Sequence, residues 1–234
     1  MSTTPPNKNI LLVGASRGLG HAMAAEYLRH GWNVVGTVRG GPRTLLHDLA
    51  DRSENRVEIE TIDICEPDQI AALRSRLSGK RFDVLFVNAG VTNDPRETIS
   101  DVTTEEFVRV MVTNALSPMR VIEALHDLVS PTGTIGVMSS GQGSVSNNTT
   151  GMREVYRGSK AALNMLMRSF AARHSDDSRT MVLMAPGWVR TDMGGPEGRL
   201  SIAESIPNLV EVLLSVQGTS GLQYLDYLGR TIPW

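Results

Sequence analysis

The sequence is short of the residues from which several kinds of site are built. A single cysteine, Cys65, cannot form an internal disulfide, and no group of cysteines and histidines has the spacing of a metal site. The 25 acidic and 23 basic residues nearly balance, and the basic residues are scattered along the chain. This distribution argues against a surface that binds nucleic acid. We therefore expect a small-molecule partner and no metal.

Long apolar runs are also missing. No segment approaches the roughly 18 apolar residues of a membrane-spanning helix, so we expect no membrane partner. Met1 to Asn9 are polar with two prolines, and the apolar run after them is too short for the core of a signal peptide. The 234 residues are 41% hydrophobic, which suits a single domain over residues 1–234. We expect this domain to be cytoplasmic.

Short apolar runs alternate with segments of helical periodicity along the chain. Strands are expected at Leu11 to Val13, Trp32 to Val38, Val57 to Ile62, Val84 to Asn88, Thr134 to Ser139, Thr180 to Ala185 and Leu222 to Leu225. Helices are expected at Leu19 to His30, Pro42 to Ala50, Pro67 to Leu77, Thr103 to Val129, Val155 to Arg173 and Ser201 to Leu214. The strands are mostly unbroken apolar runs, as burial on both faces of a sheet requires. The pattern predicts an α/β fold with one doubly wound parallel sheet.

Three glycines stand where the first strand turns into a helix, as Gly14-x-x-x-Gly18-x-Gly20. Because glycine has no Cβ, backbone N–H groups and the positive end of the helix can approach a pyrophosphate closely. The spacing departs from the G-x-G-x-x-G of the usual dinucleotide fingerprint. The turn predicts a nucleotide site, with ordinary loop chemistry as the alternative.

The position that distinguishes NAD from NADP holds no acidic residue. In NAD-dependent folds an Asp or Glu about 20 residues after the glycine turn commonly binds the ribose 2′-hydroxyl, but Arg39 stands there. Arg17 can converge on the same point, and two guanidinium groups suit a 2′-phosphate. We expect NADPH to be preferred over NADH, unless both arginines are merely solvated charges. Asp63 either accepts from the adenine amino group or is an ordinary turn aspartate.

Tyr156 and Lys160 lie four residues apart, on one face of an expected helix. A cation about 4 Å from a phenol lowers the pKa of the phenol towards neutrality when the effective dielectric constant is about 20. The positive ring of oxidised nicotinamide would act in the same direction. Such a phenol suits proton exchange with a carbonyl or an alcohol. By itself the pair is common by chance, and an exposed helix pair is the alternative.

Two further polar residues fit this chemistry. Ser140 ends the preceding strand, where its hydroxyl can share a substrate oxygen with Tyr156, and Ser139 is the rival candidate. Asn114 lies in a long expected helix, four residues before Pro118. Because proline has no N–H, the Asn114 carbonyl loses its helical partner and is free to bind a water that links Lys160 to solvent. A kink without catalytic purpose is the alternative.

Taken together, these motifs resemble the short-chain dehydrogenase/reductase family over almost the whole chain. They are Gly14-x-x-x-Gly18-x-Gly20, Asn88-Ala89-Gly90, Asn114, Ser140, Tyr156-x-x-x-Lys160 and Pro186-Gly187. Residues 156–165, 185–195 and 226–234 are similar to the C-factor-like branch. Val87 departs from the family pattern, which often has an asparagine there, and sixteen residues separate Ser140 from Tyr156, more than in many members. The extra residues, Ser144 to Gly151, are expected to form part of the substrate wall.

The resemblance implies a Rossmann-type fold with a seven-stranded, mostly parallel sheet, NAD(P)-dependent hydride transfer and a short lid around residues 191–214. It implies that Tyr156 is the acid/base and that Ser140, not Ser139, assists it. It also implies that Lys160 lowers the pKa of Tyr156 and holds the nicotinamide ribose, while Asn114 supports the proton relay. The residues and the resemblance together predict cofactor contacts at Gly14, Ser16, Arg17, Gly18, Leu19, Gly20, Arg39, Asp63, Ile64, Asn88, Ala89, Gly90, Tyr156, Lys160, Pro186, Gly187, Val189 and Thr191.

These predictions describe an NADPH-dependent reductase of an aldehyde, ketone or quinone, or an enzyme that runs the reverse reaction. The alternative is an NADP(H)-binding signalling or sensor protein in which turnover is incidental. The helix Val155 to Arg173 is apolar around most of its circumference, with Met165 and Leu166 among its side chains. Such a surface favours a homodimer or homotetramer, although core methionines are the alternative. Trp188 and Trp234 either shape the substrate pocket or belong to the core or an interface.

Overall fold

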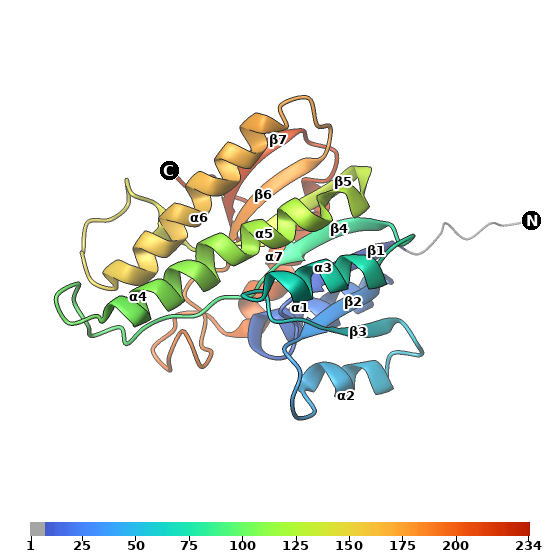
Figure 1. The fold of residues 1–234 in the computed structure, drawn as a ribbon, viewed down its shortest axis with the longest axis horizontal. Helices are drawn as coiled ribbons and strands as arrows, with labels where there is room; N and C mark the ends of the chain where they lie inside the picture. Colours follow the sequence, from blue (N-terminus) through green and yellow to red (C-terminus); the bar gives the residue numbers. More distant parts are fainter. Residues whose placement is uncertain (1–7) are drawn as a thin grey trace, which may run out of the picture.

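Seven parallel strands form the centre of the molecule (Figure 1). The computed structural model describes residues 8–234, so the expectation for Met1 to Asn9 falls mostly outside the described residues. The strand order is β3-β2-β1-β4-β5-β6-β7, and every neighbouring pair is parallel. The strands are β1 (Asn9–Val13), β2 (Asn33–Val38), β3 (Val57–Thr61), β4 (Phe82–Val87), β5 (Val129–Met138), β6 (Thr180–Ala185) and β7 (Gly221–Asp226).

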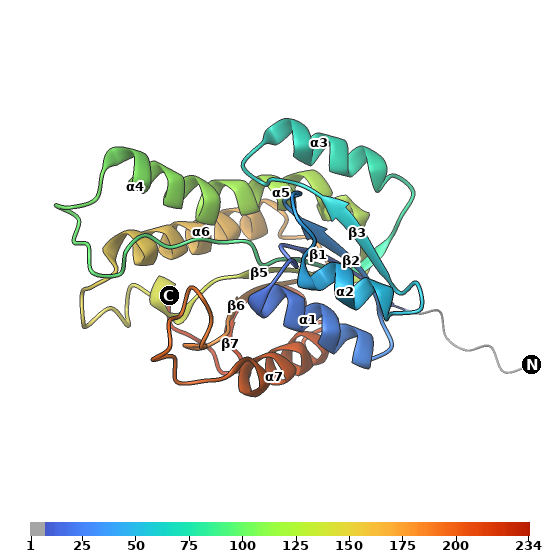
Figure 2. The same cartoon turned by 90° about the horizontal axis from the view of Figure 1, so that it is seen from below.

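Helices cover both faces of this sheet, as Figure 2 shows from the side. They are α1 (Gly18–Arg29), α2 (Leu45–Asp51), α3 (Pro67–Arg76), α4 (Thr104–Met111), α5 (Ser117–Leu125), α6 (Glu154–Arg173) and α7 (Ile202–Ser215). Helices α3, α4, α5 and α6 lie on one face, and α1, α2 and α7 lie on the other. The predicted fold class, a doubly wound Rossmann-type α/β domain with seven strands, is confirmed.

The strands are apolar throughout because successive side chains enter different cores. Leu11 and Leu85 pack with the helices of the α6 face, whereas their neighbours Ile10 and Val84 pack with the helices of the α1 face. All four side chains are fully buried. This packing fixes the register of β1 against β4 and thereby the position of the loops that follow them.

The strand order reverses between β1 and β4. Val13 and Val87 are in register at the ends of these two strands, so the two following loops leave the sheet side by side in opposite directions. In open parallel sheets, ligands bind in the crevice outside the carboxyl ends of the strands at such a point. The fold thus places the glycine turn and Asn88-Ala89-Gly90 at the mouth of a binding crevice.

The long helix expected at Thr103 to Val129 is wrong at its end and in its middle. Helix α5 stops at Leu125, and strand β5 begins at Val129. The chain between α4 and α5 is a turn of π-helix, Val112–Leu116, in which the N–H of Ser117 reaches the carbonyl of Val112. The pattern also missed the first residues of β5, of which Ser130 to Thr132 are partly or fully exposed.

Among residues 8–234, no helix combines the length and the apolar character needed to cross a membrane.

Candidate active site

A cavity of about 680 Å³ opens at the carboxyl ends of the strands. Its size is in the range of small-molecule and cofactor sites. Its wall contains every predicted site residue except Gly20 and Asn114. It runs from the glycine turn and Arg39 at one end to Ser140 and Tyr156 at the other, so the fold brings the expected nucleotide residues and the expected chemical residues into one space.

The glycine turn packs against the loop after β4 with no room for larger residues. A Cβ on Gly14 would lie 2.9 Å from the backbone nitrogen of Ala89, and the φ of Gly14 is +89°. A Cβ on Gly20 would lie 2.0 Å from the carbonyl oxygen of Gly14. The Asn88 amide Nδ2 donates to the same carbonyl at 2.9 Å. Gly14 and Gly20 therefore shape the turn, and Asn88 ties it to β4.

Gly18 differs from these two glycines. It lines the cavity with a φ of +56°, and a Cβ there would have no atom within 4 Å. The space in front of this backbone is open, as close approach of a phosphate to the start of α1 requires. The turn thus fits a dinucleotide, and contact between Gly18 and a phosphate stays a prediction.

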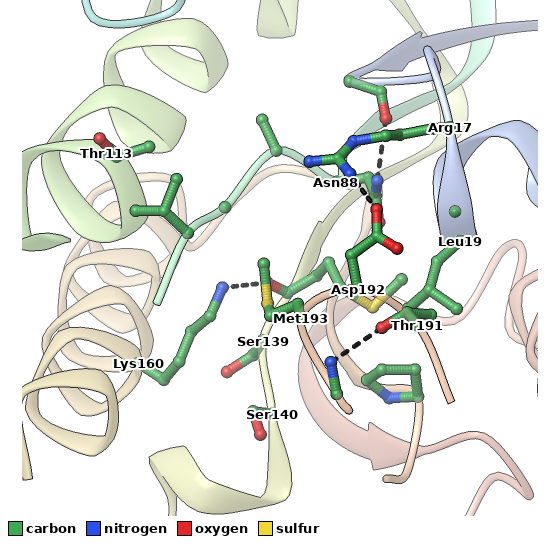
Figure 3. Close-up of a pocket in the computed structure, with 18 of the residues that line it drawn as sticks. Arg17, Leu19, Asn88, Thr113, Ser139, Ser140, Lys160, Thr191, Asp192 and Met193 are labelled. Carbon is green, nitrogen blue, oxygen red and sulfur yellow. Dashed lines mark hydrogen bonds and ion pairs between the residues drawn. The ribbon is translucent and has the colours of Figure 1, made fainter. Parts of the chain in front are cut away.

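The two arginines of the glycine turn and of β2 have different surroundings. Arg17 is ion-paired with Asp192, and both side chains are exposed, as Figure 3 shows. This carboxylate, which competes with a 2′-phosphate for Arg17, was not foreseen from the sequence. Arg39 is exposed at the end of β2, lines the cavity and forms no ion pair with any residue of the 8–234 range. A 2′-phosphate bound here would therefore face the guanidinium of Arg39, whose charge no carboxylate of the described residues neutralises.

Asp63 is engaged in the loop after β3. Its Oδ1 accepts from the N–H of Cys65 at 2.9 Å, which is the turn role that the sequence left open. Asp63 also lines the cavity, together with Ile64 and Cys65. Contact between Asp63 and the adenine stays a prediction.

Tyr156 lies in the first turn of α6, with its side chain in the cavity wall and only 9% exposed. Burial raises the pKa of its phenol above the ordinary value, while a hydrogen bond with Ser140 and the charge of Arg153 oppose that rise. The Nζ of Lys160 lies 5.9 Å from the centroid of the Tyr156 ring and donates to the carbonyl of Met138, so the expectation that Lys160 lowers the pKa of Tyr156 stays a prediction.

The two serines at the end of β5 have separate partners. The hydroxyl of Ser139 donates to the side-chain oxygen of Asn164 at 2.6 Å and is buried. The Oγ of Ser140 accepts from the N–H of Gln142 at 3.1 Å, so its proton is free to face Tyr156. Because the Ser139 hydroxyl is engaged with Asn164 while Ser140 lines the same cavity as Tyr156, the geometry favours Ser140, and its assisting role stays a prediction.

Lys160 is 3% exposed and donates to the carbonyl oxygen of Met138 at 2.9 Å. Burial lowers the pKa of its ammonium to about 8. Figure 3 shows the side chain reaching from α6 towards the end of β5. A Cβ on Gly90 would lie 3.5 Å from the Nζ of Lys160 and 3.3 Å from the Oδ1 of Asn114, so this glycine lets both side chains approach the loop after β4.

The side chain of Asn114 is held by hydrogen bonds on both of its polar atoms, and a role of its main-chain carbonyl in a proton relay stays a prediction. Asn114 is fully buried in the π-helical turn, where its Oδ1 accepts from the N–H of Val91 and its Nδ2 donates to the carbonyl of Val91, both at 2.8 Å. The same Nδ2 lies 2.9 Å from the Oγ of Ser159. Asn114 therefore joins the loop after β4 to α6 at the level of the site. The wide turn was not foreseen, since Pro118 indicated only a kink; such turns are frequent at functional sites.

Two segments differ from the expected substrate wall and lid. Ser144 to Gly151 do not line the cavity, because Ser146 is held by two hydrogen bonds to the carbonyl of Trp234. Residues 202–214 of the expected lid belong to α7, whose apolar face is buried in the core. Of the expected lid, only residues 191–194 line the cavity, and the N–H of Gly194 donates to the Thr191 hydroxyl at 3.0 Å (Figure 3). A lid role for this loop stays a prediction.

Sequence reasoning missed Arg153 altogether. It precedes α6 by one residue, lines the cavity and places its guanidinium carbon 5.0 Å from the centroid of the Tyr156 ring. Because Arg153 lies outside the helix, its spacing from Tyr156 gave no reliable signal of this contact. Of the two tryptophans left open, Trp188 lines the cavity, whereas Trp234 stacks with Arg168 outside it.

The chain was compared with known proteins. The family model described as short chain dehydrogenase matches residues 8–199. C-signal from Myxococcus xanthus is 35% identical over 154 residues, which are 65% of this chain and 92% of that protein. A Burkholderia multivorans structure described as a short-chain dehydrogenase/reductase with bound NADP is 63% identical and covers 98% of this chain and 100% of its own, with a TM-score of 0.97.

A carbonyl reductase from Pseudomonas aeruginosa, solved in complex with NADP, is 33% identical, with a TM-score of 0.88 over 97% of this chain and 100% of its own. The family match covers far more than half of the chain, and the fold and the motifs agree with it. The protein thus belongs to the short chain dehydrogenase family.

Proposed function

We propose that the protein is an NADPH-dependent reductase of an aldehyde, ketone or quinone, able to run in the reverse direction. The observation that carries the proposal is the shared cavity, in which Ser140 and the buried Tyr156 face the same space as the glycine turn. The similarity to carbonyl reductases solved with NADP supports the same substrate class and cofactor.

The chain's own residues have distinct tasks in this proposal. Ser140 and Tyr156 both donate to the oxygen of the substrate carbonyl, and Tyr156 gives up its proton as the carbonyl becomes an alcohol. Lys160 keeps a positive charge behind them, and Asn114 fixes the loop that faces Lys160. The dinucleotide, when bound, supplies the hydride.

Preference for NADPH follows from charge at the adenosine end. Arg39 has no neutralising partner there, and a 2′-phosphate offers the forked guanidinium several acceptors. Replacing Arg39 with glutamine should weaken NADPH binding by about tenfold or more and leave NADH binding unchanged. Wild-type protein that uses NADH at least as efficiently as NADPH would contradict the cofactor assignment.

The decisive experiment follows NADPH oxidation with a panel of aldehydes, ketones and quinones. We expect Tyr156→Phe to lower kcat/KM by at least about 100-fold, because loss of the phenolic proton donor removes the acid catalyst. NADPH affinity, measured by fluorescence titration, should change little. Tyr227→Phe removes a phenol outside the cavity and serves as the matched control.

Tight NADPH binding without turnover of any carbonyl would refute the reductase and favour the sensor alternative. Full activity in Tyr156→Phe would refute the role of this residue while leaving the reductase in place.

A further inference from the structure

An unpaired arginine stands at the substrate end of the cavity. Arg153 is half-buried, and no carboxylate within residues 8–234 forms an ion pair with it. Its Nη2 reaches only the Thr92 hydroxyl, at 3.3 Å, and its Nε is buried without any hydrogen-bond partner among those residues. A buried guanidinium donor without a partner is costly, so an unpaired one at a cavity wall calls for an acceptor from a ligand.

The backbone of Arg153 has an unusual, left-handed conformation. Its φ of +65° and ψ of +38° are left-handed, a conformation that is unfavourable for a residue with a Cβ. Glycine or asparagine would adopt this conformation more easily. The position instead carries a long cation, and that cation lies over the Tyr156 ring.

A second arginine lies in the same part of the cavity wall, but its charge is balanced. Arg109 lines the cavity and donates to the carbonyl of Thr92, the residue whose hydroxyl Arg153 contacts. Glu106 neutralises Arg109 through two hydrogen bonds. Of these two arginines, Arg153 therefore contributes the positive charge that no carboxylate of the described residues balances.

The two unpaired arginines lie at opposite ends of one cavity. Arg39 follows β2 and stands beside the glycine turn, whereas Arg153 precedes α6 and stands beside Tyr156. The first suits a phosphate of the cofactor. The second lies close enough to the proposed proton donor to meet a group only a few bonds from the reacting carbonyl.

We propose that Arg153 selects oxo acids, that is, carbonyl compounds with a carboxylate a few bonds from the carbonyl that is reduced. The guanidinium binds the carboxylate through charge-assisted hydrogen bonds and so turns the carbonyl towards Ser140 and Tyr156. The proposal rests on the reductase function given above and names its substrate class. Arg153 is a specificity-determining residue, distinct from the proton donor.

The test compares an oxo acid with its methyl ester, which has the same carbonyl and no charge. Phenylglyoxylate and methyl phenylglyoxylate form one pair, and levulinate and methyl levulinate form a second with a longer spacing. We expect wild-type protein to favour the acid in kcat/KM in at least one pair. Arg153→Gln should lower the ratio of acid to ester by about tenfold or more, and Arg153→Lys should lower it less.

Two further variants separate recognition from folding. Arg153→Asn suits the left-handed backbone and removes the guanidinium, so it should lower the ratio without loss of thermal stability. Arg157→Gln removes an arginine one turn further along α6 that binds Met152 and Thr150 and does not line the cavity. It should leave the ratio unchanged.

Each outcome decides the matter. The proposal would be overturned if wild-type protein preferred the ester in both pairs, or if Arg153→Gln lost acid and ester turnover equally. In either case, turnover of the ester would still support the reductase function. If no carbonyl is turned over, the reductase function is refuted. Calorimetric titration with phenylglyoxylate then tests separately whether Arg153 binds a carboxylate. Binding that is weaker in Arg153→Gln than in wild type supports the anion site, and no binding overturns it.

Discussion

Lys160 shows how a single residue can be favourable for chemistry and unfavourable for folding. Its ammonium is buried, and burial lowers its pKa from 10.5 to about 8. The folded chain therefore binds fewer protons at this residue than the unfolded chain between pH 8 and pH 10.5. Stability from this residue rises as the pH increases through that window, and below pH 8 the full cost of the buried charge is present.

Replacing Lys160 with methionine should consequently stabilise the protein at pH 7 while abolishing turnover. Relief of the buried charge, offset by loss of the hydrogen bond to Met138, gives a net gain of about 2 kcal/mol in the free energy of unfolding. The gain should shrink as the pH is raised from 8 towards 10.5. Thermal unfolding of both proteins across this range measures it, with Lys80→Met, at an exposed ion pair, as the control. A variant less stable than wild type at pH 7 would contradict the argument.

Tyr156 and Ser140 illustrate what the sequence could establish about the site at the residue scale. Their spacing and the strand end predicted that the two side chains share one site, and both line the same cavity. The direction of the Tyr156 pKa could not be predicted, because it depends on burial by residues from several distant elements. Arg153 was missed for a related reason, since its left-handed backbone has no signature in the neighbouring sequence.

At the scale of the element, the glycines of the turn differ in their surroundings: one is needed for the shape of the turn, and another faces the cavity. Gly20 is packed against the carbonyl of Gly14 and lies outside the cavity, whereas Gly18 faces open space inside it. The two glycines thus serve different ends within three residues of chain, and substitutions at them should have different consequences.

Gly20→Ala should cost about 2 kcal/mol of stability or more, because its Cβ would meet backbone that cannot move aside. Gly18→Ala should cost only about 1 kcal/mol, for its positive φ, but should weaken NADPH binding by about tenfold or more, because its Cβ enters the cavity. Thermal unfolding and NADPH fluorescence titration of both variants test the contrast. Equal losses of stability, or unchanged NADPH binding in Gly18→Ala, would contradict it.

Element boundaries were predictable where the apolar pattern is strong. Strand β6 has the bounds that its unbroken apolar run indicates, and helix α6 differs by one residue. The region of residues 112–129 was not predictable from the same pattern, because a π-helical turn and a bulge in the pairing of β4 with β5 keep apolar residues buried without a regular period. Both irregularities depend on tertiary packing.

At the scale of the whole molecule, the apolar residues of α6 divide between the core and the surface. Leu163, Met167 and Phe170 are fully buried, whereas Met165 and Leu166 are 63% and 40% exposed. On the neighbouring α4, Phe107 and Val108 are also exposed, and the two helices lie side by side (Figure 1). We propose that this surface joins copies of the chain in a homodimer or homotetramer.

Sedimentation velocity should therefore show a dimer or tetramer, and Met165→Glu should shift it towards monomer, because a charge would be buried at the contact. Arg168→Glu, one turn along the same helix but beneath Trp234, is the control and should change assembly less. A wild-type protein that sediments only as monomer would refute the assembly. The cytoplasmic location also stays a prediction.

The central place of β1 has a further consequence, for biosynthesis. This strand is the first to be translated, yet one of its two neighbours, β4, pairs Leu85 with Leu11 and so arrives more than seventy residues later. Contacts between such distant residues slow folding, because the entropy of closing the loop is lost before the pairing is gained. Until then β1 presents an unpaired apolar edge that another nascent chain could join. The sheet cannot assemble in the order in which the ribosome delivers its strands.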